Sequence, residues 1–152
     1  MPNPSVAVHN IELSLKIVIQ SLIDSQRGFQ KIGENLKNEL LKKYFLSESL
    51  QRAAFRGELE SVLHHEGMHD IVESGSVTGT ILRIWAGVQA KIHEGDHALL
   101  VTAEQAEVET LQAYQDAKDR ELPLPVRQLL SVQTAHVATS LDYVKAAREA
   151  SK

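Results

Sequence analysis

The chain contains no cysteine among its 152 residues. Disulfide bonds, thiolate metal sites and cysteine nucleophiles are therefore all excluded. Aromatic residues are also scarce, with three Phe, three Tyr and one Trp, so the sequence offers no series of rings on which nucleic-acid bases could stack. The net charge is −4, and the basic residues are scattered rather than clustered. We therefore expect neither nucleic acid nor an anionic membrane surface as a partner.

The N-terminus has neither a secretory signal nor a long apolar run. It lacks a basic region followed by an apolar segment, the pattern of a signal peptide. The longest apolar stretch nearby, residues 17–23, is interrupted by Gln20 and Ser21, whereas a membrane span needs about 20 mostly apolar residues. The expected location is therefore the cytoplasm.

The composition and pattern indicate one folded, all-α domain over residues 1–152. Hydrophobic residues make up 43% and charged residues 24%, as in an ordinary globular domain. Residues 1–6, which contain two of the four prolines, are expected to form a loose tail. No stretch shows the sustained apolar–polar alternation of a half-buried strand, and this absence favours helices throughout.

Apolar residues recur at helical spacing in four long segments and one shorter segment. Asn38 is the expected N-cap of the second long helix and Gly67 its stop, while Asp96 is expected to cap the third long helix. Pro125 stands near the first position of the last helix, where proline is favoured. The first helix should start between residues 5 and 10 and end near residue 36. The other predicted helices cover about 39–66, 77–92, 97–121 and 125–150.

The lengths of the connections predict the topology. Short connections join the first pair and the last pair of long helices, so each pair should be antiparallel. The segment 67–96 between the pairs is long enough to cross back along the bundle, and it carries the short helix around Trp85. These features predict a ferritin-like four-helix bundle with one long crossover, in which the helices over 39–66 and 97–121 are parallel.

The first half of the first helix is apolar on more than one face, which requires cover from two sides. We expect Ile81, Trp85 and Val88 of the short helix to cover part of this surface. The remainder is expected to form a homodimer contact, because large exposed apolar patches are uncommon on monomers. The additional apolar residues are Leu13, Ile17, Ile19 and Ile23.

Polar residues interrupt the apolar stripes at similar depths on the four long helices. Glu104 and Glu107 lie one helical turn apart and can face the same way, so their charges need compensation if both are buried. One interpretation is a metal site for Fe, Mn or Zn, formed by Glu104, Glu107 and His136 together with Glu48. Another is a hydrogen-bonded network without an ion, with Glu107 closest to His136. A third is that these residues face solvent. The interrupting residues are Asp24, Ser25, Glu48, Gln51, Glu104, Glu107, Gln133 and His136.

Several segments resemble a family of bacterial ferritin-like four-helix-bundle proteins of unknown function. The resemblance spans about Leu15 to Arg148 and implies the fold, together with kinship to carboxylate-bridged metal proteins, but no activity. Ferritin-like di-iron proteins carry Glu on two helices and Glu-x-x-His on the other two. This sequence departs from that pattern, because Gln133 stands where a Glu would precede His136. The resembling segments are YFLSESLQRAAFRGELE, GSVTGTILRIWAG, GDHALL and ELPLPVRQLL.

A second group of potential ligands lies near the end of the second long helix. Imidazoles and carboxylates at this density can hold Zn or Ni, although histidines at a helix C-terminus also suit the helix dipole and face solvent. The group comprises His64, His65, Glu66, His69 and Asp70, with His93 and His97 further along the chain.

Two functions of different class follow from these patterns. The first is a non-catalytic interaction or stress-related module with a buried polar layer. The second is a carboxylate and histidine metal-binding protein, in the form of a metal-dependent oxidoreductase. The sequence leaves open whether the protein is an enzyme.

Overall fold

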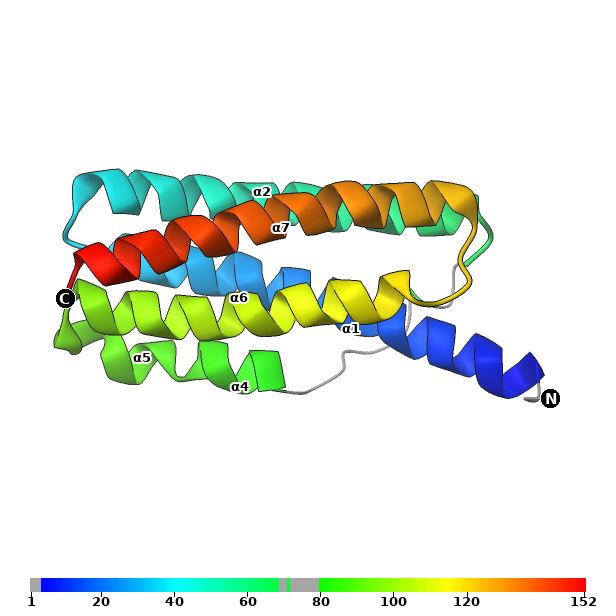
Figure 1. Ribbon diagram of the computed structural model, residues 1–152, viewed down its shortest axis with the longest axis horizontal. Helices are drawn as coiled ribbons and strands as arrows, with labels where there is room; N and C mark the ends of the chain where they lie inside the picture. Colours follow the sequence, from blue (N-terminus) through cyan, green and yellow to red (C-terminus); the bar gives the residue numbers. More distant parts are fainter. Residues whose placement is uncertain (1–3, 69–70, 72–79) are drawn as a thin grey trace.

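The computed structural model describes residues 4–68, 71 and 80–152 (Figure 1). Every element in these residues is a helix, which confirms the all-α prediction. The elements are α1 (Pro4–Asn35), α2 (Glu39–His65), α4 (Thr80–Ala86), α5 (Val88–Lys91), the short 3-10 helix η1 (Ile92–Glu94), α6 (Asp96–Lys118) and α7 (Leu124–Ala150).

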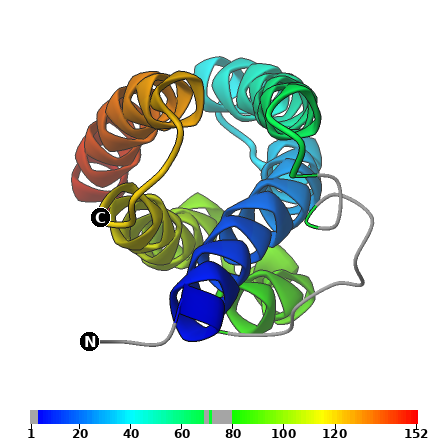
Figure 2. The same ribbon diagram turned by 90° about the vertical axis from the view of Figure 1, so that its right-hand side faces the viewer.

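The four long helices surround a common core in the order α1, α2, α7 and α6 (Figure 2). Helices α4 and α5 lie outside this ring and pack against α1 and α6. Figure 1 shows that α2 and α6 run in the same direction, opposite to α1 and α7. The predicted parallel arrangement of the second and third long helices is therefore confirmed.

Local signals set the ends of α2 as predicted. The side-chain oxygen of Asn38 accepts a hydrogen bond from the backbone N–H of Leu41 at 3.0 Å, which satisfies one of the free donors of the first turn. At the other end, Gly67 has a φ of 78°, a left-handed conformation that glycine adopts without steric cost. A helix of this length therefore follows from its two capping residues and a proline-free sequence.

Asp96 has a different role from the predicted one. Its carboxylate accepts hydrogen bonds from the backbone N–H groups of Lys37 and Asn38, at 2.8 and 3.0 Å. Gly95 precedes α6 as its N-cap, with no side-chain capping bond. Asp96 therefore joins the start of α6 to the turn between α1 and α2, while its charge still suits the first turn of α6.

Helix α1 begins at Pro4, inside the segment 1–6 that was expected to be a loose tail. Proline is compatible with a first helical turn, because the backbone N–H that it lacks has no partner there. The N-terminal turns of α1 extend past the ends of the other helices (Figure 1).

The core consists of two apolar clusters with polar residues between them. One combines the first half of α1 with the second half of α2, the second half of α6 and α7. The other combines the second half of α1 with the first parts of α2 and α6 and with α4 and α5. The large members of the first include Leu15, Leu22, Phe55, Leu59, Leu63 and Tyr114. Those of the second are Phe29, Ile32, Phe45, Trp85, Leu99 and Leu100.

Trp85 anchors α4 on α1 as expected, although further along α1 than predicted. Its ring lies 5.5 Å from that of Phe29 between centroids, and a Cβ at Gly28 would lie 2.0 Å from the nearest indole atom. Gly28 therefore permits the close approach of the two helices. The part of α1 around Leu13, which is 41% exposed, is not the part that Trp85 covers. The side chain of Ile81 lies outside the described residues.

No helix in the described ranges combines the length and the apolar character that a membrane span requires.

Candidate functional site

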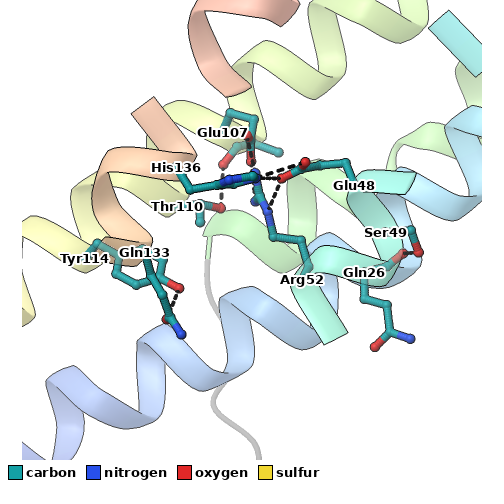
Figure 3. A network of polar contacts seen from close by, with 10 residues as sticks. Gln26, Glu48, Ser49, Arg52, Glu107, Thr110, Tyr114, Gln133 and His136 are labelled. Carbon is teal, nitrogen blue, oxygen red and sulfur yellow. Dashed lines mark hydrogen bonds and ion pairs between the residues drawn. The ribbon is translucent and has the colours of Figure 1, made fainter. Parts of the chain in front are cut away.

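A buried arginine stands at the centre of the polar residues that interrupt the core (Figure 3). Arg52 on α2 is fully buried, as is Glu107 on α6. The two terminal nitrogens of the guanidinium donate to the two oxygens of Glu107 at 2.7 and 2.6 Å. The Nε–H of Arg52 donates to Glu48 at 2.9 Å. The guanidinium thus bridges two carboxylates in the fork geometry that arginine favours.

The position of Arg52 follows from the spacing on α2 and from its neighbour on α1. Arg52 lies four residues after Glu48, so both side chains share one face of the helix. The central carbon of its guanidinium lies 4.8 Å from the centroid of the Phe29 ring. An aromatic face at this distance favours a cation. Glu107 then approaches from the helix diagonally opposite (Figure 2).

The electrostatic environment keeps Arg52 charged. Burial by itself lowers the pKa of Arg52, because it removes water from the guanidinium. The adjacent carboxylates of Glu107 and Glu48 more than offset this effect and raise the pKa above its usual value. The buried layer therefore contains a permanent positive charge.

His136 on α7 connects this layer to the surface. Its Nε2 lies 2.8 and 3.1 Å from the two oxygens of Glu48, and because a carboxylate only accepts, Nε2 carries the hydrogen. The ring packs edge-on against Phe55, with centroids 4.9 Å apart. The side chain of His136 is 38% exposed, compared with 5% for that of Glu48. His136 is thus the member of the layer that solvent reaches.

A second chain of hydrogen bonds lies beside the ion pairs. The hydroxyl of Tyr114 donates to Gln133 at 2.8 Å, and the amide nitrogen of Gln133 donates to the backbone carbonyl of Phe55 at 3.1 Å. Burial raises the pKa of Tyr114, so its hydroxyl remains a donor. Gln133 is therefore used to join α6 and α7 to α2, and it does not donate to a carboxylate.

Two tyrosines close the boundary between α2 and α7 next to this layer. Tyr44 and Tyr143 stack with their ring centroids 3.7 Å apart. Burial raises the pKa of Tyr44, which keeps its hydroxyl protonated. Helices α2 and α7 thus meet through this aromatic stack as well as through the contacts of His136 with Glu48 and Phe55.

The structure brings together three of the four residues predicted to form a metal site. Glu48, Glu107 and His136 all belong to the layer, but Glu104 does not. Its carboxylate forms an ion pair with Arg148 at the edge of the bundle, where both side chains are about one-fifth exposed. The predicted contact between Glu107 and His136 is wrong, because Glu107 binds Arg52 and His136 binds Glu48.

Arg52 is the central residue of this layer, and the sequence pattern did not single it out. The stripe on α2 predicted Glu48 and Gln51 on the inward face. Glu48 is buried, but Arg52, one residue after Gln51, is the fully buried one. The available signal was the spacing of four residues between Glu48 and Arg52, which places opposite charges together on a helix.

No three histidine, aspartate or glutamate side chains in the described ranges are arranged to hold a metal ion. Within the central layer, Arg52 lies between the carboxylates that would have to converge on a cation. In the second predicted group, His69 and Asp70 lie outside the described residues. His97 is placed elsewhere, with its Nδ1 3.0 Å from the hydroxyl of Ser151.

These features define an all-helical protein with a buried layer of charged and polar side chains. A family model described as a "Domain of unknown function (DUF2383)" matches residues 10–120. The chain therefore belongs to this family. No curated protein and no solved structure matches the chain. The family is one of unknown function, as the resemblance had indicated, and its description carries no activity.

Proposed function

We propose that the chain is a ferritin-like four-helix bundle with one long crossover, and that it acts as a non-catalytic interaction or stress-related module in the cytoplasm. The parallel α2 and α6 support this topology (Figure 1), because one long crossover between antiparallel pairs produces that arrangement.

The observation that carries the non-catalytic proposal is the bridge from Arg52 to Glu107 and Glu48. Buried carboxylates need a compensating positive charge, and here the chain supplies it from its own arginine. The same carboxylates are consequently engaged and are not presented to an external cation. The layer then serves to hold the helices together.

The experiment is a measurement of metal content and thermal stability on protein without a histidine tag. We expect no stoichiometric Fe, Mn or Zn after purification, and no rise in melting temperature when Fe²⁺, Mn²⁺ or Zn²⁺ is added. A bound metal would stabilise the folded state by mass action. One equivalent of tightly bound metal, with a rise in melting temperature that Glu107→Gln removes, would overturn the proposal.

The second candidate is a metal-binding protein, in the form of an Fe-, Mn- or Zn-dependent oxidoreductase. The observation in its favour is that Glu48, Glu107 and His136 lie in one connected cluster, and oxygen and imidazole ligands suit these metals. Such a site requires the side chain of Arg52 to move away. Glu104, the fourth predicted ligand, is paired with Arg148.

The variant Arg52→Gln distinguishes the two candidates, because it removes the internal cation and leaves the three potential ligands. If Arg52 alone prevents metal binding, the variant gains a Co²⁺ absorption spectrum that the wild-type protein lacks. Arg148→Gln is the matched control, since it breaks the partly exposed arginine–glutamate pair instead. A wild-type protein that already gives the Co²⁺ spectrum supports the metal-binding candidate.

We further propose that a second copy of the chain covers the apolar surface of α1. Leu13 is 41% exposed there, and the N-terminal turns of α1 extend past the neighbouring helices (Figure 1). Light scattering coupled to gel filtration tests this proposal. Leu13→Glu should convert a dimer to a monomer, whereas Leu50→Glu, at a 72% exposed position on α2, should not. A monomeric wild-type protein would contradict it.

A further inference from the structure

Tyr44 on α2 and Tyr143 on α7 form the closest ring contact among the described residues. Their ring centroids lie 3.7 Å apart, with an angle of 22° between the ring planes. The other contacts between aromatic rings in this part of the chain have centroids at least 4.9 Å apart. Two phenol rings are thus held face to face between two helices that do not follow one another in the chain.

The two rings differ in how well they are anchored and in their access to solvent. Tyr44 is half-buried, and its ring also contacts that of Phe45 edge-on, with centroids 6.1 Å apart. Tyr44 therefore packs against the second apolar cluster of the core. Tyr143 is the outer ring of the stack and is 37% exposed. A reagent in solution consequently reaches Tyr143 more readily than Tyr44.

The other side chains that are readily oxidised are few or protected. The chain has no cysteine, Tyr114 is fully buried and Trp85 is 6% exposed. Met68 is partly buried, and its oxidation would add an oxygen atom without joining two helices. Met1 lies outside the described residues. A one-electron oxidant in solution therefore finds an accessible phenol at Tyr143, directly beside a second phenol.

We propose that Tyr44 and Tyr143 form an oxidative modification site, at which a one-electron oxidant converts the stacked pair into an intramolecular dityrosine cross-link. Each phenol loses one electron to the oxidant and one proton to water, which leaves two phenoxyl radicals. A carbon–carbon bond then forms between the ring carbons next to the two hydroxyl groups. The hydrogens on these two carbons move to the oxygens, so the product retains both hydroxyls and has lost two electrons and two protons.

The stack supplies the proximity that the coupling step needs. Radicals on separate molecules must meet by diffusion, whereas groups held in contact react as one unit. Because the rings of Tyr44 and Tyr143 already touch, rotation of the side chains, and not movement of the helices, brings the two ring edges together. The bond would join the α1–α2 pair to the α6–α7 pair covalently. No step involves a metal held by the layer around Arg52, so the inference stands independently of the proposed function.

Photo-oxidation by ruthenium(III) tris-bipyridine, generated with light and persulfate, tests the proposal on dilute wild-type protein. We expect blue dityrosine fluorescence in a product that migrates as a single chain on a denaturing gel, with a mass lower by two hydrogen atoms. Proteolysis and tandem mass spectrometry should identify linked peptides that contain Tyr44 and Tyr143. A product linked only between separate chains would overturn the proposal, as would oxidation of Tyr143 without any dityrosine.

Substitutions separate the effect of the stack from that of exposure. Tyr44→Phe and Tyr143→Phe each keep a ring in the stack but remove one phenol, so each should abolish the intramolecular product. Tyr114→Phe is the matched control and should leave it unchanged. The double variant Tyr44→Phe/Val132→Tyr restores the number of phenols, with one at an exposed position on α7 about three helical turns from Tyr143. Intramolecular dityrosine in this variant would show that exposure, and not the stack, determines the reaction.

Thermal stability provides a second measurement. The cross-link between α2 and α7 closes a long loop and, like a disulfide of equal span, lowers the entropy of the unfolded chain. The melting temperature of cross-linked wild-type protein should therefore rise by about 10 °C. Tyr143→Phe oxidised in the same way should show no rise. A cross-linked protein that melts no higher than the untreated one would contradict a bond formed between helices in their native positions.

Discussion

Two arginine–glutamate pairs join α6 to other helices, and they differ in their access to water. Glu107 pairs with Arg52, and both side chains are fully buried. Glu104, one turn earlier on the same helix, pairs with Arg148, and both side chains are about one-fifth exposed. The same two residue types therefore form a fully buried ion pair in one case and a partly exposed ion pair in the other.

Because the two pairs differ in burial, we expect the environment of each charge, and not its neighbours in the sequence, to determine how much the pair contributes to stability. Loss of one partner from a buried ion pair leaves an uncompensated charge away from water, which costs about 3–5 kcal/mol. A pair that water reaches can exchange its partner for water, and contributes about 0–1 kcal/mol when it is well exposed. Glu104 and Arg148 are partly exposed, so we expect the upper part of this range for them. The pairs of Glu107 and Glu104 should consequently respond very differently to equivalent substitutions.

The largest effect is expected for Arg52→Met, which leaves Glu48 and Glu107 buried without their cation. The free energy of unfolding should fall by about 3–5 kcal/mol. Urea denaturation followed by circular dichroism measures this change. A loss below 1 kcal/mol would mean that the buried pair resembles the exposed one, and the contrast between the two pairs would then fail.

Glu107→Gln should have the next largest effect and should lower the free energy of unfolding by about 2–3 kcal/mol. The substitution keeps the shape of the side chain but removes the charge and one of the two acceptors that Arg52 uses. A network in which neutral donors surround the carboxylate would tolerate this change at little cost. A double-mutant cycle with Arg52→Met measures the coupling between the two residues, and additive losses would contradict direct pairing.

His136→Gln is expected to lower the free energy of unfolding by about 1 kcal/mol. The substitution affects a partly exposed hydrogen bond to Glu48 and an edge-on contact with Phe55. Arg52 still compensates Glu48 in this variant. The same denaturation experiment tests the expectation. A loss as large as that of Arg52→Met would show that His136, and not only the arginine, balances the buried charges.

The smallest effect is expected for Arg148→Gln, which should lower the free energy of unfolding by about 0–1 kcal/mol. Salt provides the sharper measurement, since ions screen exposed charges more than buried ones. Addition of 1 M NaCl should remove most of the difference between wild type and Arg148→Gln. The difference between wild type and Arg52→Met should persist under the same conditions.

Local signals in the sequence were sufficient for the four long helices and their directions. They did not predict the break at Gly87, where the helix expected over about 77–92 is divided into α4 and α5, with η1 following. Asn38 and Gly67 delimit α2 through contacts within a few residues, and the short connections from α1 to α2 and from α6 to α7 make each of these two pairs antiparallel. The start of α1 at Pro4 was not predicted, because a proline near the N-terminus is equally compatible with a tail and with a first helical turn.

The candidate site was only partly predictable, because its contacts connect distant parts of the chain. The polar residues on α2, α6 and α7 indicated a layer, but a pattern does not resolve which of two adjacent residues faces inward. Gln51 and Arg52 differ by about 100° around the helix axis, and the choice depends on Phe29 and on Glu107, 55 residues away. Asp96 is a similar case, since its partners are in a distant turn.

The fork between Arg52 and Glu107 also fixes the register of two helices that are not neighbours. Helices α2 and α6 occupy opposite corners of the ring (Figure 2), so side chains in the core must connect them. Apolar side chains can exchange partners when one helix slides along another. The two parallel hydrogen bonds of 2.7 and 2.6 Å cannot exchange partners in this way, because a slip of one helical turn moves the partners apart by about 5.4 Å. The hydrogen-bonded pair of Arg52 and Glu107 therefore fixes the axial position of α2 relative to α6. Alignments shifted by one helical turn would break both hydrogen bonds.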